Sequence, residues 1–171
     1  MAVLSTAAVV TLVLVGDIRL DGPVGAIARD EGDAAPVALV KESLSGDFLL
    51  GNLEEPLTRR GTAATKKFTF RAPPERTSIL KACGFDALGL ANNHVMDYGA
   101  EGLEDTLAAL DRAGLPHLGA GRNSAAARRP LVFERNGLKV GLLALTSTFP
   151  EEAWAGRNKP GTAFSELARV E

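Results

Sequence analysis

The sequence predicts an α/β fold built around a mainly parallel β-sheet. Short apolar runs alternate with segments of helical periodicity, which is typical of strands joined by crossover helices. Residues 99–114 carry leucines at helical spacing, and residues 130–147 combine two apolar runs with the Asn136-Gly137 pair of a tight hairpin turn. No internal repeat interrupts this pattern, and 171 residues are enough for one domain with a hydrophobic core.

The first predicted strand spans Val9–Val15 and is expected to be buried, because it is rich in branched apolar residues. The surrounding apolar stretch has the length of a secretory signal, but no Lys or Arg precedes it. The stretch is also too short for a comfortable transmembrane span. We therefore expect a cytoplasmic chain without a membrane span.

The next predicted elements are a helix, a strand and a polar segment. The helix covers residues 35–46, and the strand covers Asp47–Leu50 and ends at Gly51. Residues 55–74 are polar and broken by prolines, and their middle, residues 66–72, alternates in the manner of an edge strand or a flap. The second half of the chain is more regular. Its predicted elements are a helix over 74–84, a strand over 85–91, a helix over 99–114, a short strand and turn over 116–121, a short helix over 123–130 and the hairpin.

Composition and charge exclude several classes of protein. The net charge of −2 gives no broad attraction to nucleic acid or to an anionic membrane, so no nucleic-acid partner is expected. The single cysteine, Cys83, cannot form an internal disulfide and is expected to be a small buried residue. A local basic cluster is predicted to be a solvated loop, and it consists of Arg59, Arg60, Lys66, Lys67 and Arg71.

Polar side chains follow three of the predicted strands. They are Asp17 after the first, Asn52 and Glu54 after the second, and Asn92, Asn93 and His94 after the third. The carboxyl ends of parallel strands meet at one edge of a sheet, and two carboxylates placed close together repel unless a cation lies between them. Oxygen-rich ligands with a nearby histidine suit Mn, Mg, Fe or Zn more than copper. Such an ion polarises a phosphoryl oxygen and activates water, and a histidine can protonate the leaving group.

Each of these residues also has a structural interpretation. Asp17 can cap a helix or turn, Glu54 can pair with Arg59 or Arg71, and His94 can be a hydrogen-bonded structural residue. The asparagines can stabilise turns. Asp97 is interpreted as the N-cap of the helix over 99–114, and His117 as a structural residue.

Several motifs resemble the bacterial capsule synthesis protein CapA family. They are "LVGDIRL", "GNLEEPLT", "KKFTFRAPPE", "GFDALGLANNHVMDYGAEGLEDTLAALDRAGLPHLGAGRN" and "NGLKVGLLALT", and they run in order from about residue 9 to the end. The resemblance implies a link to capsule or poly-γ-glutamate biosynthesis. It also implies the α/β sandwich of calcineurin-like metallophosphoesterases.

The resemblance assigns roles to four residues. Asp17 matches the aspartate of an opening Gly-Asp motif and Glu54 the acid of an Asn-Leu-Glu motif, which implies that both bind a divalent metal. Asn93 matches the metal-binding asparagine of an Asn-His pair, and His94 matches the catalytic histidine that assists phosphoryl transfer. Asn52 and Asn92 match family positions without a clear chemical assignment.

The chain departs from the family pattern in two ways. Arg19 stands where ordinary metallophosphoesterases have a ligating histidine, and the two histidine motifs of the family's C-terminal part are absent. We therefore expect residues 1–171 to form the N-terminal part of a single CapA-like domain, truncated at its C-terminus. Two functions stay open: a metal-dependent phosphoesterase-type hydrolase, inactive if the missing motifs are essential, and a non-catalytic module. The first would act on a phosphate ester, and the second would bind an anionic polymer or a capsule synthase partner.

Overall fold

A four-stranded parallel sheet forms the centre of the fold. The computed structural model describes residues 8–165. The sheet has the order β1-β2-β3-β4, with every neighbouring pair parallel. Its strands are β1 (Leu12–Ile18), β2 (Phe48–Leu53), β3 (Ala87–Gly89) and β4 (His117–Leu118). Each strand follows the previous one in sequence and in space, so all carboxyl ends lie at one edge of the sheet.

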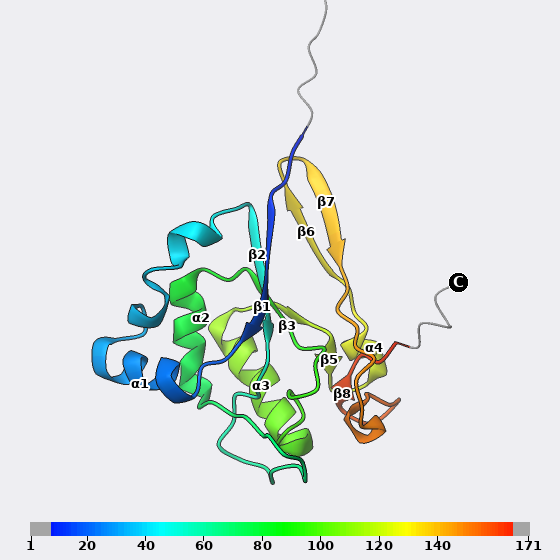
Figure 1. Cartoon of the computed structure of the whole chain (residues 1–171). Helices are drawn as coiled ribbons and strands as arrows, with labels where there is room; N and C mark the ends of the chain where they lie inside the picture. The colour runs from blue at the N-terminus through cyan, green and yellow to red at the C-terminus, as the bar shows by residue number, and fades with distance from the viewer. Residues whose placement is uncertain (1–7, 166–171) are drawn as a thin grey trace, which may run out of the picture.

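Three helices cover one face of this sheet (Figure 1). They are α1 (Gly22–Glu31), α2 (Thr77–Cys83) and α3 (Gly99–Ala113), and the 3-10 segment η3 (Pro74–Arg76) leads into α2. The predicted stripe of α3, made of Leu103, Leu107 and Leu110, is buried against Leu53 and Leu88 of the sheet in one hydrophobic cluster. The burial of these side chains holds the helical layer on the sheet.

The predicted hairpin is confirmed, but it forms a sheet of its own. Strands β6 (Leu131–Arg135) and β7 (Leu138–Leu142) pair antiparallel around Asn136 and Gly137, whose φ angles are +52° and +77°. Positive φ at both central residues is what a tight hairpin turn requires. The hairpin lies on the side of the main sheet opposite the helices (Figure 1), where Phe133 stacks on Phe48 with ring centroids 3.9 Å apart.

A third, small sheet lies at the lower right of Figure 1. It pairs β5 (Ala120–Gly121) with β8 (Gly161–Thr162), next to α4 (Ser124–Ala127) and the 3-10 segment η4 (Glu151–Ala153). The predicted short helix over 123–130 is thus confirmed as α4, and the side chain of Asn123 caps it by accepting from the backbone N–H of Ala126.

The predictions for the first fifty residues were less accurate. The first strand runs over Leu12–Ile18 instead of Val9–Val15, and it is not buried: Leu14 is 63% exposed. The reason is that β1 is an edge strand with only one face against helices. The second strand does not end at Gly51 but continues to Leu53. Gly51 lies inside the strand because neighbouring side chains pack so closely there that a Cβ would collide with them.

The helix predicted over residues 35–46 is wrong. Two 3-10 segments stand there instead, η1 (Ala35–Val37) and η2 (Lys41–Leu44), with backbone bonds between residues three apart. Pro36 has no N–H to donate, and branched valines lower helix propensity, so the chain turns more tightly. Residues 66–72 form no edge strand; Ala72 makes a single bridge with Leu57.

Within the residues that the structure describes, no helix is long and apolar enough to cross a membrane.

Candidate functional site

The candidate site lies at the carboxyl edge of the parallel sheet. Asp17 of β1 pairs in register with Asn52 of β2, and Asn52 pairs with Gly89 of β3. Asn92 follows β3 by three residues and lies at the same edge. The parallel order predicted from the sequence therefore brings these loops together.

Two asparagines connect the carboxylates of the site. The amide nitrogen of Asn52 donates to Asp17 Oδ1 at 2.7 Å and to Glu54 Oε2 at 3.2 Å. Asn92 in turn donates to Asn52 Oδ1 at 3.0 Å and to the backbone carbonyl of Leu53 at 2.8 Å. Asp17 and Glu54 therefore lie on either side of one amide nitrogen, and Asn52 has a clear structural role that the sequence did not assign.

Glu54 is a buried acid in this cluster. Burial raises the pKa of its carboxyl group, and the nearby charge of Asp17 raises this pKa further. The Glu54 Oε1 atom lies 3.5 Å from His94 Nε2. Glu54 does not pair with Arg59 or Arg71, since Arg59 contacts Glu75 and Arg71 lies over the ring of Tyr98. The surface ion pair considered for Glu54 is therefore wrong.

The turn that carries His94 is stabilised by Asn92. Its side-chain oxygen accepts from the backbone N–H groups of His94 at 2.9 Å and of Val95 at 2.8 Å. The imidazole is buried, with Nδ1 2.8 Å from Asp97 Oδ2 and Nε2 directed toward Glu54. The ring of Phe70 packs against it, with centroids 4.4 Å apart.

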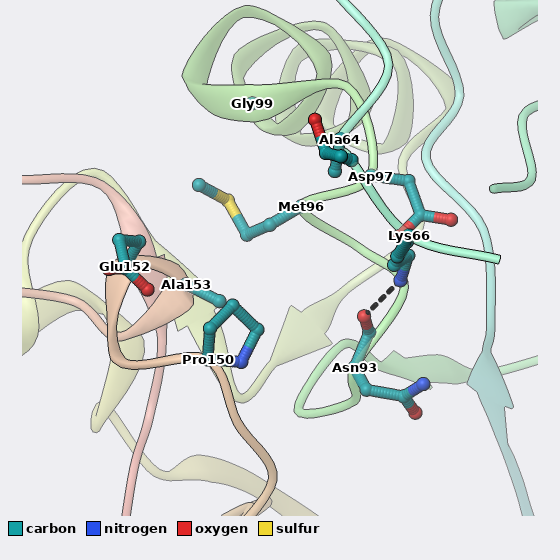
Figure 2. A pocket seen from close by; sticks show the side chains of 10 residues that line it. Ala64, Lys66, Asn93, Met96, Asp97, Gly99, Pro150, Glu152 and Ala153 are labelled. Carbon is teal, nitrogen blue, oxygen red and sulfur yellow. Dashed lines mark hydrogen bonds and ion pairs between the residues drawn. The ribbon is translucent and has the colours of Figure 1, made fainter. Parts of the chain in front are cut away.

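Asn93 has a different environment from the other predicted site residues. It is exposed, and its backbone carbonyl accepts from Lys66 Nζ at 2.8 Å. Asn93 lines a cavity of about 530 Å³ between the turn over residues 93–99 and η4. Figure 2 shows that its side chain points away from Met96 and Pro150, which line the same cavity. The structure thus brings Asp17, Glu54 and His94 together, and the described residues include no contact of the Asn93 amide with either carboxylate.

Asp97 is not the N-cap that the sequence predicted. The N-cap of α3 is Tyr98, and no side chain caps that helix. Asp97 is buried and instead contacts His94, Lys66 and the backbone N–H of Phe70. Asp97 follows His94 by three residues, a spacing that lets the two side chains come into contact across one turn. This spacing could have identified the pair from the sequence.

A second buried acid was also missed. Glu55 is fully buried and accepts from the backbone N–H groups of Leu20 and Asp21, which tie the loop after β1 to the loop after β2. Burial raises the pKa of Glu55 to about 7.

His117 was predicted to be a structural residue. Its Nδ1 atom lies 3.4 Å from the carbonyl oxygen of Leu115, which agrees with that role.

The described donor set does not amount to a metal centre. Among residues 8–165, no three His, Cys, Asp or Glu side chains form a group that could hold a metal ion. What the cluster does offer is two carboxylates, one with a raised pKa, beside an imidazole nitrogen. Two carboxylates at such short range repel each other when both are ionised, which is consistent with the raised pKa of Glu54.

Comparisons with known proteins agree on one family. The sequence model of the bacterial capsule synthesis protein PGA_cap family matches residues 11–169. The capsule biosynthesis protein CapA of Bacillus anthracis is 33% identical over 157 residues, which cover 89% of this chain and 38% of that protein. The PGA biosynthesis protein CapA of Bacillus subtilis is 30% identical over 151 residues, covering 86% and 40%.

A probable polyglutamine synthesis accessory protein of Mycobacterium tuberculosis is 39% identical over 127 residues, covering 71% of this chain and 33% of that protein. The chain therefore spans between 33% and 40% of the length of these three curated relatives.

Proposed function

The chain belongs to the bacterial capsule synthesis protein PGA_cap family, and on this premise we propose that it serves capsule or poly-γ-glutamate synthesis. The names of two relatives refer to capsule or PGA biosynthesis. The partners we propose are an anionic polymer or phosphate-ester substrate and a capsule synthase.

We propose that the wider fold is a metallophosphoesterase-like sandwich, of which residues 1–171 are the N-terminal part of one domain. The support is the face of the sheet opposite the helices. The β6–β7 hairpin covers Phe48 on this face, but Leu12 and Leu14 of the neighbouring strand β1 stay 37% and 63% exposed. Parallel sheets are normally covered on both faces, and the relatives are more than twice as long as their matched regions. A further layer of the family fold would cover these leucines.

The cluster of Asp17, Glu54 and Asn93 is proposed to hold a divalent ion, Mn, Mg, Fe or Zn, together with ligands from outside the described residues. The observation that carries the proposal is the carboxylate pair joined by the Asn52 amide, with the pKa of Glu54 raised by burial and by Asp17. A cation beside these groups would relieve their repulsion. The proposed role of Asn93 as a metal ligand rests on the family resemblance alone.

The chemistry proposed for this site is hydrolysis of a phosphate ester or a related bond. A bound divalent ion would supply a Lewis acid and an activated water molecule. Asn52 and Asn92 fix the positions of the carboxylates. His94 presents Nε2 at the edge of the cluster, where this nitrogen can accept a proton and pass it on to a leaving group.

A non-catalytic binding module is the second candidate. It is favoured by one observation: the Asn52 amide already satisfies both carboxylates, and residues 8–165 contain no complete metal-binding group. Such a module would use the same scaffold to bind an anionic polymer or a synthase.

Metal binding and turnover separate the two candidates. The metal-free chain is titrated with Mn²⁺ in a calorimeter, and hydrolysis of a chromogenic phosphodiester is followed with and without Mn²⁺. We expect Mn²⁺ to bind, and Asp17→Asn and Glu54→Gln to weaken binding by at least about tenfold. The matched controls Asp111→Asn and Glu75→Gln remove exposed carboxylates and should leave binding unchanged. Turnover should require Mn²⁺ and be lost in His94→Ala. Absence of both binding and turnover in the wild-type chain would favour the binding module.

A further inference from the structure

Residues 61–72, called here the 61–72 loop, cover the histidine of the candidate site. The Phe70 ring lies on one side of His94, with centroids 4.4 Å apart. Lys66 Nζ lies 3.1 Å from His94 Nδ1 and also donates to the Asn93 carbonyl at 2.8 Å. Lys66 was predicted to be part of a solvated cluster, but it contacts the imidazole directly.

Asp97 fastens this loop to the turn that carries His94. Its side-chain Oδ2 accepts from the backbone N–H of Phe70 at 2.8 Å, and its backbone carbonyl accepts from Ala64 at 2.8 Å. Its other carboxylate oxygen forms an ion pair with Lys66. At the start of the loop, Gly61 lies so close to the carbonyl of Tyr98 that a Cβ would collide with it. The loop therefore has a defined position over the imidazole.

Two neighbours compete for His94 Nδ1. The carboxylate of Asp97, 2.8 Å away, can only accept a hydrogen bond while ionised, whereas the ammonium of Lys66 can only donate one. If Nδ1 carries the hydrogen, it donates to Asp97 and Nε2 keeps its lone pair toward Glu54. If Nδ1 lacks the hydrogen, its lone pair faces the Asp97 carboxylate at 2.8 Å. This is closer than the 3.5 Å between Nε2 and Glu54, so the repulsion is stronger in this tautomer.

We propose that Asp97 and Lys66 are positioning residues for His94: Asp97 sets the Nδ1–H tautomer, and Lys66 neutralises Asp97 and holds the 61–72 loop over the ring. The side chain of Asp97 is 1% exposed, and a carboxylate at that depth needs a paired cation. Lys66 is the cation that meets it. The consequence is that Nε2 is the nitrogen without a hydrogen, and it faces Glu54.

The proposal rests on the proposed function in one respect, the chemical role given to His94. The test of the proposal measures the imidazole tautomer and requires neither bound metal nor turnover. The whole chain is labelled with ¹⁵N on the histidine rings, and the tautomer is read by NMR at one alkaline pH where imidazole is neutral. His117→Gln identifies the signals of His94. In the wild type we expect Nδ1 in the protonated range and Nε2 in the unprotonated range.

Asp97→Ala should reverse these two signals, because the acceptor is gone and Lys66 can then donate to Nδ1. Lys66→Met should keep the carboxylate but release the loop, with loss of the nuclear Overhauser contact between Phe70 and His94. Lys66→Arg should restore the contact. Lys67→Met is the matched control, because Lys67 lies over Phe68 and not at His94.

A folded Asp97→Ala chain that keeps the wild-type tautomer would overturn the proposal. So would an undiminished Phe70–His94 contact in Lys66→Met. If Asp97→Ala does not fold, Lys66→Met decides, since it leaves the buried carboxylate in place. The chain could fail to bind Mn²⁺ and still show the expected tautomer and contacts. That result would contradict the proposed function and would leave the proposed positioning of His94 intact.

Discussion

The stability of the fold should fall as pH rises through the titration of Glu55. The side chain of Glu55 is fully buried, and burial raises its pKa from 4.5 to about 7. Between these two values the folded chain keeps a proton that the unfolded chain has released, so the free energy of unfolding decreases with increasing pH. This difference in pKa corresponds to about 3 kcal/mol of unfolding free energy. That contribution is fully present below pH 4.5 and is lost above pH 7.

The measurement is urea unfolding in metal-free buffer at several pH values between 4.5 and 7.5, for wild type and Glu55→Gln. Glutamine keeps an oxygen for the N–H groups of Leu20 and Asp21 and does not titrate. We expect the two curves of unfolding free energy against pH to diverge by about 3 kcal/mol over this range. Glu54, whose pKa is also raised, contributes a slope of the same sign to both. Glu75→Gln, on the surface, should follow the wild type. Parallel curves for wild type and Glu55→Gln would show that Glu55 does not keep its proton in the folded chain.

Three further substitutions test the packing around the site. Gly61→Ala places a Cβ against the carbonyl of Tyr98 at a φ of +82°, and should cost about 1–3 kcal/mol in thermal unfolding; an unchanged midpoint would contradict the close contact. Thr106→Val removes the hydroxyl that accepts from Leu57 N–H at 2.8 Å and should cost about 1–3 kcal/mol, because that buried donor loses its partner. Leu14→Glu, on the open sheet face, should change the unfolding free energy by no more than about 0.5 kcal/mol and reduce binding of an apolar dye; a large loss of stability would show that this face is covered.

Local signals in the sequence were sufficient for much of the fold. The leucine stripe of α3 and the Asn136-Gly137 turn depend on neighbours in the chain, and both were predicted correctly. The parallel order of the strands then implied that the ends of β1, β2 and β3 meet, and Asp17 and Glu54 do lie together. α1 was missed, and β1 was expected to be buried although it is an edge strand. Whether a strand is an edge depends on the whole sheet and is not visible in its own residues.

Contacts between distant segments could not be predicted for the same reason. Glu54 and Glu55 are neighbours in an ordinary polar run, yet one faces Asp17 and the other is buried under the loop after β1. In the sequence, Lys66 belongs to a basic cluster that is typical of a solvated loop. Only the folded chain places it against Asp97 and His94. The family resemblance identified the catalytic and metal-binding candidates, but it gave no information about the residues that position them.

Localisation of bound Mn²⁺ by NMR tests directly whether a metal site lies at the carboxyl edge of the sheet. Paramagnetic Mn²⁺ broadens backbone signals near its binding site, so a titration of the ¹⁵N-labelled chain maps where the ion sits. We expect broadening to begin at residues 17, 52–54 and 92–94 and to be lost in Asp17→Asn. Broadening confined to exposed acids elsewhere, such as Asp111 or Glu151, or unchanged in Asp17→Asn, would contradict a metal-binding cluster at the carboxyl edge of the sheet.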